Sequence, residues 1–231
     1  MLEITVRALK FSLLFGLLFA SACGVSNPTP SVPPTITVSS ASPTNRPNDT
    51  PVPLPSATPT QVAASVILDD FEAAQTAWAA GTEAFFTDSS ATGLSLTGEH
   101  ASQGNQALQL NFELNDKPKA IFFIDQSFDL SQAHYLQLDV YNPGSLASLG
   151  VAFQTGPEKV WYESDGIPVG AGKPASLNFD LTASTYKAAS TNWEFRASIP
   201  DLNSVSRLAL IVYPAESGSV FIDNLRTSDT P

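Results

Sequence analysis

Apolar and polar residues alternate in short runs between residues 65 and 231, and turn-forming residues separate the runs. Period-two alternation is typical of β-strands with one buried face, and no long stretch repeats with the 3.6-residue period of a helix. Many short strands divided by Gly, Pro and Asn predict an all-β sandwich of two antiparallel sheets. The expected strands are 66–72, 83–87, 92–98, 106–114, 119–128, 134–142, 148–155, 159–163, 175–181, 193–198, 205–213 and 218–226.

The first and last of these strands both place acidic residues among apolar ones. Asp223 lies inside the apolar run of strand 218–226, where an unpaired carboxylate would be costly, so it needs a partner or a metal ion. Two such strands side by side could share a hard cation. The candidate ligands of a structural Ca²⁺ are Glu72 and Asp223, followed by Asp70. In the alternative interpretation, these carboxylates only accept backbone N–H bonds or cap turns.

Residues 1–22 are typical of an export signal peptide. A basic start with Arg7 and Lys10 precedes a short apolar core, which is too short to span a bilayer as a mature helix. Cys23, the only cysteine, follows small residues, and residues 18–23 resemble the lipobox of bacterial lipoproteins, with Ala20 where Leu is more usual. The resemblance implies lipidation at Cys23; the alternative is ordinary cleavage after Ala22, which leaves a free thiol.

Residues 23–64 are rich in Pro, Thr and Ser and carry almost no charge. Proline fixes φ and removes a backbone donor, so this segment cannot build a core and favours extended conformations. We therefore expect a linker that holds a single domain, residues 65–231, away from a membrane.

The chain is acidic, with a net charge of −11 at pH 7. Removing residues 1–22 takes away two bases, Arg7 and Lys10, and one acid, Glu3, so the charge becomes −12. An acidic chain without basic clusters argues against nucleic acid and anionic lipid surfaces as partners. It favours neutral polymers or cations, and leaves the predicted lipid anchor as the only membrane contact. We expect an exported monomer, anchored to the bacterial cell membrane with its domain outside.

Three motifs carry a family resemblance: Leu-Asp-Asp-Phe-Glu at 68–72, Gly-Asn-Gln-Ala-Leu-Gln-Leu at 104–110, and Val-Phe-Ile-Asp-Asn-Leu-Arg at 220–226. Together they resemble the galactose-binding-like jelly-roll domains, which include non-catalytic carbohydrate-binding modules such as family eleven. The resemblance covers residues 65–228. It implies a jelly-roll fold, a polysaccharide ligand such as a β-glucan or another plant or microbial glycan, and a calcium ligand in loop 102–106.

Alternation along strand 134–142 predicts a ligand face. Leucines and Val140 point one way, and tyrosines beside an amide and a carboxylate point the other. Sugars bind such mixtures, because their C–H faces pack on aromatic rings while hydroxyls meet polar groups. Outward tyrosines and glutamines are also ordinary on a solvent-exposed sheet. The candidate ligand-binding residues are Tyr135, Gln137, Asp139, Tyr141, Gln154, Trp161, Tyr162 and Arg207, whereas Trp78 and Trp193 are expected to be core or loop anchors.

Catalytic motifs are missing from the sequence: it has no Gly-x-Ser-x-Gly elbow, no phosphate-binding glycine loop and no His or Cys set for a transition metal. We therefore predict a non-catalytic module that binds a polysaccharide. Two alternatives stay open: a protein-docking or assembly module of the same fold, which an apolar face would favour, and a glycan-active enzyme, which an exposed carboxylate pair in a cleft would favour.

Overall fold

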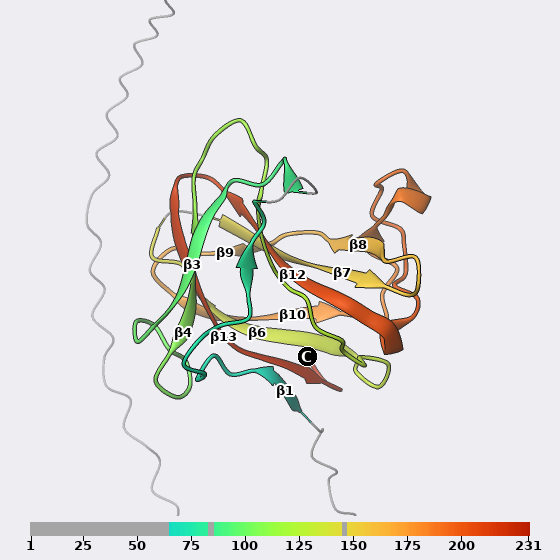
Figure 1. Cartoon of the computed structure of the whole chain (residues 1–231), viewed down its shortest axis with the longest axis horizontal. Coiled ribbons are helices and arrows are strands. Elements are labelled where there is room, and N and C mark those ends of the chain that lie inside the picture. The colour runs from blue at the N-terminus through green and yellow to red at the C-terminus, as the bar shows by residue number, and fades with distance from the viewer. Residues whose placement is uncertain (1–64, 83–85, 145–146) are drawn as a thin grey trace, which may run out of the picture. The chain divides into compact units, whose positions relative to one another are not determined.

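Two stacked antiparallel sheets make up the domain in the computed structural model, which describes residues 65–82, 86–144 and 147–231. Figure 1 shows β7, β8 and β12 in one layer and β6, β10 and β13 in the layer below. The fold is the all-β jelly-roll sandwich expected from the alternating pattern. Each sheet therefore has one face toward the core and one outer face.

Six strands form the first sheet, here called sheet A, and they include both the first and the last strand of the domain. Its order is β10 (Pro174–Asp180), β6 (Tyr135–Tyr141), β13 (Gly218–Ser228), β4 (Ala107–Phe112) and β3 (Ala91–Thr97), with β1 (Val66–Asp69) also paired to β13.

Seven strands form the second sheet, called sheet B. Its order is β11 (Tyr186–Lys187), β8 (Val160–Ser164), β7 (Ala147–Thr155), β12 (Val205–Pro214), β5 (Ala120–Ile124) and β2 (Ala79–Ala80), with β9 (Ile167–Val169) paired to β7. Two short 3₁₀ turns, η2 (Ala189–Thr191) and η3 (Leu202–Ser204), lie in the connections after β11 and before β12.

Side chains from the inner faces of both sheets fill the core. Leu136, Leu138 and Val140 of β6 are buried in it, as are Leu208 and its alternating neighbours on β12. Burying each such side chain stabilises the fold by about 1.5–3 kcal/mol relative to exposure. The period-two prediction for these two strands is confirmed.

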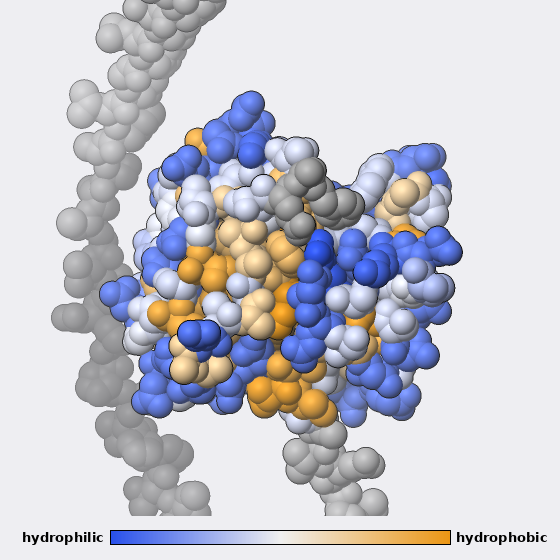
Figure 2. Space-filling model, viewed as in Figure 1, coloured by the Kyte–Doolittle hydropathy of each residue, from blue (hydrophilic) through white to orange (hydrophobic). Residues whose placement is uncertain are grey.

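The first and last strands pair antiparallel, as predicted, with Val66 opposite Thr227 and Ile67 opposite Arg226. Val66 and Ile67 are 58% and 49% exposed. Figure 2 shows a hydrophobic patch at the bottom of the domain, where Figure 1 labels β1.

Some predicted strands are wrong. Residues 193–198 form a turn rather than a strand, because Tyr186 and Ala197 bond each other's backbone and close a loop between them. The predicted strand 106–114, which would turn Leu114 toward the core, is too long: β4 ends at Phe112, and Leu114 is 53% exposed. Strands β2, β9 and β11 have only two or three residues, too few for an alternating pattern to reveal them. Within the predicted strand 83–87, residues 83–85 are outside the described residues.

The predicted signal peptide, the lipidation site Cys23 and the linker 23–64 also lie outside the described residues. In the part of the chain that the structure describes, no helix has the length and apolar character to cross a membrane.

Candidate functional site on the outer faces of the sandwich

The predicted ligand-binding residues lie on two opposite faces and in the core. Strand β6 belongs to sheet A, whereas β7, β8 and β12 belong to sheet B, so no single ligand face can contain the whole set. Tyr135, Gln137, Asp139 and Tyr141 are on the outer side of sheet A; Gln154, Trp161 and Arg207 are on the outer side of sheet B; Tyr162 is buried in the core.

Tyr162 is therefore out of reach of a ligand on either outer face. It follows Trp161 on β8, and adjacent residues of a strand point to opposite sides. Trp161 points outward, which places the Tyr162 ring, only 7% exposed, among the core side chains.

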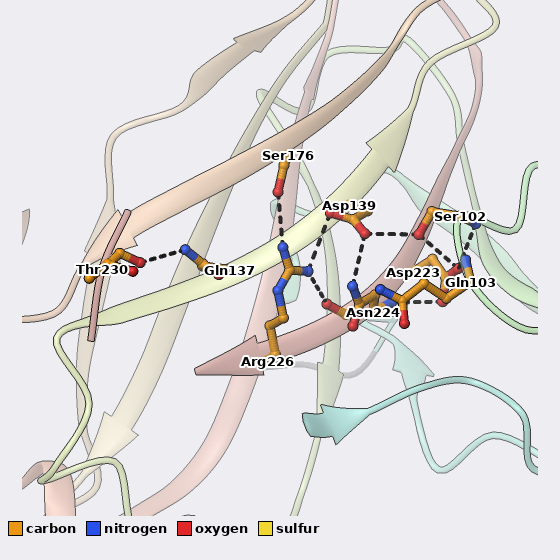
Figure 3. A network of polar contacts seen from close by, with 9 residues as sticks. All are labelled: Ser102, Gln103, Gln137, Asp139, Ser176, Asp223, Asn224, Arg226 and Thr230. Atoms are coloured by element: carbon orange, nitrogen blue, oxygen red, sulfur yellow. Dashed lines mark hydrogen bonds and ion pairs between the residues drawn. The ribbon is translucent and has the colours of Figure 1, made fainter. Parts of the chain in front are cut away.

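On sheet A, Asp139 is the centre of a polar network (Figure 3). Its carboxylate accepts bonds from Ser102 Oγ at 2.9 Å and Asn224 Nδ2 at 3.0 Å, and it pairs with Arg226 at 3.3 Å. Burial opposes ionisation of Asp139, but the bonds from Asn224 and Ser102 outweigh it and hold its pKa below the usual range. Arg226 also donates to Ser176 on β10. These groups bind one another across three strands and the loop after β3.

The other side chains of this face are also engaged. Gln137 is 8% exposed, and its amide donates to the Thr230 carbonyl at 2.8 Å (Figure 3). Tyr141 stacks on His100, with ring centroids 3.8 Å apart, and His100 meets Phe221 edge-on. The loop after β3 and the C-terminal residues thus cover part of the outer face of sheet A, and a hollow of about 460 Å³ lies beside Asp139 and Tyr141.

Two of the predicted metal ligands hold loop 102–106 directly. Glu72 Oε1 accepts the N–H groups of Asn105 and Gln106 at 2.7 and 2.8 Å. Asp223 Oδ2 accepts those of Ser102 and Gln103, also at 2.7 and 2.8 Å. The backbone bonds from Asn105 and then Gln106 lower the pKa of Glu72.

The approach of Glu72 requires glycine at position 104. Gly104 has φ +62°, a left-handed conformation, and a Cβ there would clash with the Glu72 carboxylate. The Glu72 carboxylate therefore explains the Gly-Asn-Gln motif: it leaves no room for a Cβ at position 104, and it accepts the N–H groups of Asn105 and Gln106.

Calcium at this loop stays a prediction. The N–H bonds to Glu72 and Asp223 match the alternative interpretation of these carboxylates, and Asp70 accepts the N–H of Glu72 at 3.2 Å. Among residues 65–82, 86–144 and 147–231, no three His, Cys, Asp or Glu side chains are grouped closely enough to hold a metal ion. A cation here would need carbonyl oxygens of the loop as further ligands.

On sheet B, side chains line up across the strands. Arg207 of β12 is opposite Gln154 of β7, which is opposite Trp161 of β8. The next row places Ala152 between Ala209 and Glu163. Ala152 and Ala209 are fully buried there, in a second hydrophobic cluster against which Trp161 and Tyr213 pack.

Arg207 closes one end of this face. Its guanidinium binds Asp125 through two hydrogen bonds, of 2.6 and 2.8 Å, and lies 4.2 Å from the centre of the Phe123 ring. The bond from Arg207 lowers the pKa of Asp125. Bidentate pairing of this kind fixes the geometry of both side chains.

A hollow of about 230 Å³ lies beside Trp161. Figure 2 shows the surface hollowed next to the segment 186–197, which is orange at the upper right of Figure 1. The residues that line the hollow are Phe86, Asp88, Lys119, Ile121, Trp161, Glu163 and Trp193.

The wall of the hollow contains a buried charge network centred on Glu163. Its fully buried carboxylate binds Lys119 and Lys187, each at 2.7 Å, and accepts Tyr213 OH at 2.7 Å and Trp161 Nε1 at 3.2 Å. Burial opposes the charge on Glu163, but the bonds from Lys119 and Lys187 outweigh it and lower its pKa. Burial and the neighbouring carboxylate raise the pKa of Tyr213. The network holds the Trp161 indole in a defined orientation.

Trp193 was expected to be a core or loop anchor. It lies in the loop after β11, on the wall of the hollow, and is 53% exposed, so it is not a core residue. The available signal was its setting: Trp193 is a lone aromatic within the polar run Ser-Thr-Asn-Trp-Glu. Trp78, by contrast, is 4% exposed and its indole donates to Asp69, as expected of an anchor.

Solved structures with the same fold include carbohydrate-binding modules. The family 11 module of a cellulosomal cellulase of Clostridium thermocellum is 12% identical, with a TM-score of 0.52 over 72% of this chain and 95% of that one. The Clostridium thermocellum family 11 module in complex with a β-1,3-1,4-mixed-linked tetrasaccharide is 13% identical, with a TM-score of 0.52 over 73% and 96%. An exo-β-agarase is 17% identical, with a TM-score of 0.52, over 71% of this chain but 25% of the enzyme.

A search of the curated proteins finds no match to this chain. A family model does match: it is described as mannanase, galactose-binding domain-like, and it aligns with residues 69–191, more than half of the chain. The matched residues begin in β1 and extend through β11 to η2, so they include both β6 and the strands that carry Trp161 and Glu163. This chain belongs to the mannanase galactose-binding domain-like family.

Proposed function

We propose that the domain binds a polysaccharide without cleaving it, and that the binding surface is the outer face of sheet B. The observation that carries this proposal is the hollow on that face, where Trp161 and the exposed Trp193 lie beside the Glu163 network. It combines aromatic surface with charged hydrogen-bonding groups, the combination that sugar rings require.

The lysines of the network can also serve a ligand. An ammonium group has three N–H donors, and Lys119 and Lys187 each bind Glu163 through one hydrogen bond or ion pair. Their side chains are 14% and 20% exposed, so they are held in place yet reach the surface. Rigid donors of this kind bind hydroxyl oxygens with little loss of side-chain entropy.

The acids of the hollow favour binding over hydrolysis. Glycoside hydrolysis needs a carboxylic acid with a raised pKa and a second carboxylate across the scissile bond. Glu163 has a lowered pKa and is paired with two lysines, and Asp88 lies 3.8 Å from Lys119. Glu163 therefore does not have the environment of a proton donor.

The ligand class we propose is a neutral β-linked polysaccharide of plant or microbial origin, a β-glucan or a mannan. The net charge of −11 disfavours anionic polymers. A family 11 module of the same fold is described in complex with a β-1,3-1,4-mixed-linked tetrasaccharide, and the family name refers to mannanases.

We place this domain on the cell surface as part of the same proposal. The predicted signal peptide, lipidation at Cys23 and Pro-rich linker would tether it outside a bacterial membrane. A structural Ca²⁺ beside loop 102–106 belongs to the proposal too, since Glu72 and Asp223 are the carboxylates nearest the loop backbone.

A glycan array probed with the full chain tests the proposal. We expect binding to neutral β-linked glucans or mannans, and Trp161→Ala should weaken it about ten-fold or more, as for aromatic hot spots elsewhere. Tyr141→Ala, on sheet A, is the matched control and should leave the affinity unchanged. A blank array from folded protein would overturn the proposal, and loss of binding in Tyr141→Ala alone would move the site to sheet A.

A further inference from the structure

Two consecutive residues of the loop after β11 have left-handed backbone conformations: Asn192 with φ 53° and Trp193 with φ 61°. Asparagine tolerates this region, but a bulky aromatic residue there is a genuine outlier. Left-handed strain of this kind persists only where surrounding contacts impose it, and it is concentrated at functional sites.

The contacts that impose it are hydrogen bonds within the loop. Trp193 N–H donates to the Ala188 carbonyl at 3.0 Å. Thr191 Oγ1 accepts the N–H of Ala188 at 3.2 Å and donates to the Glu194 carbonyl at 2.7 Å. One hydroxyl thus joins both sides of the turn and holds the backbone at Trp193.

The strained turn places a large apolar ring in solvent. Trp193 is 53% exposed and Phe195 is 44% exposed, so neither ring contributes full burial to the stability of the domain. Lys187 connects the turn to the hollow, because it binds Glu163 at 2.7 Å and lies 5.1 Å from the centre of the Phe195 ring. The strain costs free energy in the unbound domain, and the exposed rings offset little of it by burial.

We infer that the Asn192–Trp193 turn is a strained sugar-stacking element, in which Trp193 sets the affinity of the sheet B site at the expense of the domain's own stability. The inference rests on the proposed function. The ligand is a pyranose ring of a neutral polysaccharide, whose C–H face packs on the Trp193 indole and whose hydroxyls point toward Lys119 at the wall of the hollow. A backbone held in advance spends no ordering entropy when the sugar arrives.

Trp193→Gly and Trp193→Ala in the full chain separate strain from stacking, because both remove the indole but only glycine is unstrained at φ 61°. The probes are mannotetraose and a β-1,3-1,4-mixed-linked glucan tetrasaccharide, measured by calorimetry, with thermal melts of each variant. We expect both variants to bind about ten-fold more weakly or worse. We also expect the glycine variant to melt above the alanine variant, although glycine raises the entropy of the unfolded chain.

The control is Trp193→Phe, which keeps an aromatic face and should retain part of the affinity. Binding by either variant at the wild-type level would overturn the stacking role while leaving the proposed function intact. A glycine variant that melts below the alanine variant would overturn the role of strain. If wild-type protein binds neither probe nor any glycan of the array, the proposed function itself fails.

Discussion

The outer face of sheet A and the outer face of sheet B contain similar residue types but use them differently. On sheet A, Asp139 and Gln137 are bonded to neighbouring protein groups, and Tyr141 is covered by His100. On sheet B, Trp161 is held by Glu163 at the edge of a hollow, and Trp193 is exposed. Both faces have a hollow, of about 460 Å³ on sheet A and about 230 Å³ on sheet B, so the faces differ in the side chains that line them. Those on sheet A are paired or stacked with one another, whereas Trp193 on sheet B is 53% exposed.

The two faces also differ in what their charges stabilise. Asp223 of sheet A and Glu72 anchor a loop through its backbone N–H groups, whereas Glu163 of sheet B binds side chains from three strands and from the segment before β5. Substitutions on sheet A should therefore alter loop stability, and substitutions at the sheet B network should alter both stability and binding.

The largest loss of unfolding free energy is expected from Glu163→Gln. The substitution removes the countercharge of Lys119 and Lys187, which are 14% and 20% exposed, and one uncompensated buried charge typically costs about 3–5 kcal/mol. Urea denaturation measures the decrease in the free energy of unfolding. Asp88→Asn, which removes only a half-exposed partner of Lys119 at 3.8 Å, is the control and should cost under about 1 kcal/mol. Equal losses in the two variants would contradict the central role of Glu163.

The next largest loss of unfolding free energy, about 1–3 kcal/mol, is expected from Asp223→Asn. The new amide NH₂ group can face the N–H groups of Ser102 and Gln103, from which Asp223 Oδ2 now accepts hydrogen bonds. Asp70→Asn is the matched control on the exposed side of the same region and should be close to neutral. Hydrogen exchange at Ser102 and Gln103 gives the local readout. Unchanged protection of these amides in Asp223→Asn would refute the anchoring role.

Acidification should lower the stability of the domain, because carboxylates on both sheets lose their charge. The folded-state pKa values of Glu163 and Asp139 are lowered, so their contributions are present above the unfolded pKa values, about 4.3 for Glu and 3.9 for Asp, and are lost as the pH falls through the lower folded values. Stability measured from pH 6 to pH 3 should decline below about pH 4.5. In Glu163→Gln the free energy of unfolding should fall less steeply with decreasing pH than in the wild type. An identical slope would show that Glu163 does not contribute to the acid sensitivity.

The core pattern was predictable from the sequence, and the site was not. Alternation at Leu136 and Leu208 identifies an inner face within one strand, because neighbouring side chains must point to opposite sides. The sheet that a strand joins depends on pairing across the whole chain, so nothing local separates β6 from β8. Trp193 was assigned to a strand because the bonds of Thr191 that create its turn are tertiary details without a period.

The smallest expected effect is that of chelation, which tests the calcium proposal at loop 102–106. If Ca²⁺ links Glu72 and Asp223 to carbonyls of this loop, excess EDTA should lower Tm by several degrees, since a ligand that binds only the folded state stabilises it by mass action. Added Ca²⁺ should restore the melt, and added Mg²⁺ should not, because Mg²⁺ demands a smaller and more regular site. Glu72→Gln is the matched variant: it removes one carboxylate and should abolish the response to EDTA. A wild-type melt that EDTA leaves unchanged would refute the calcium proposal and leave the N–H bonds to Glu72 and Asp223 as the interactions that hold the loop, with the sheet B site unaffected.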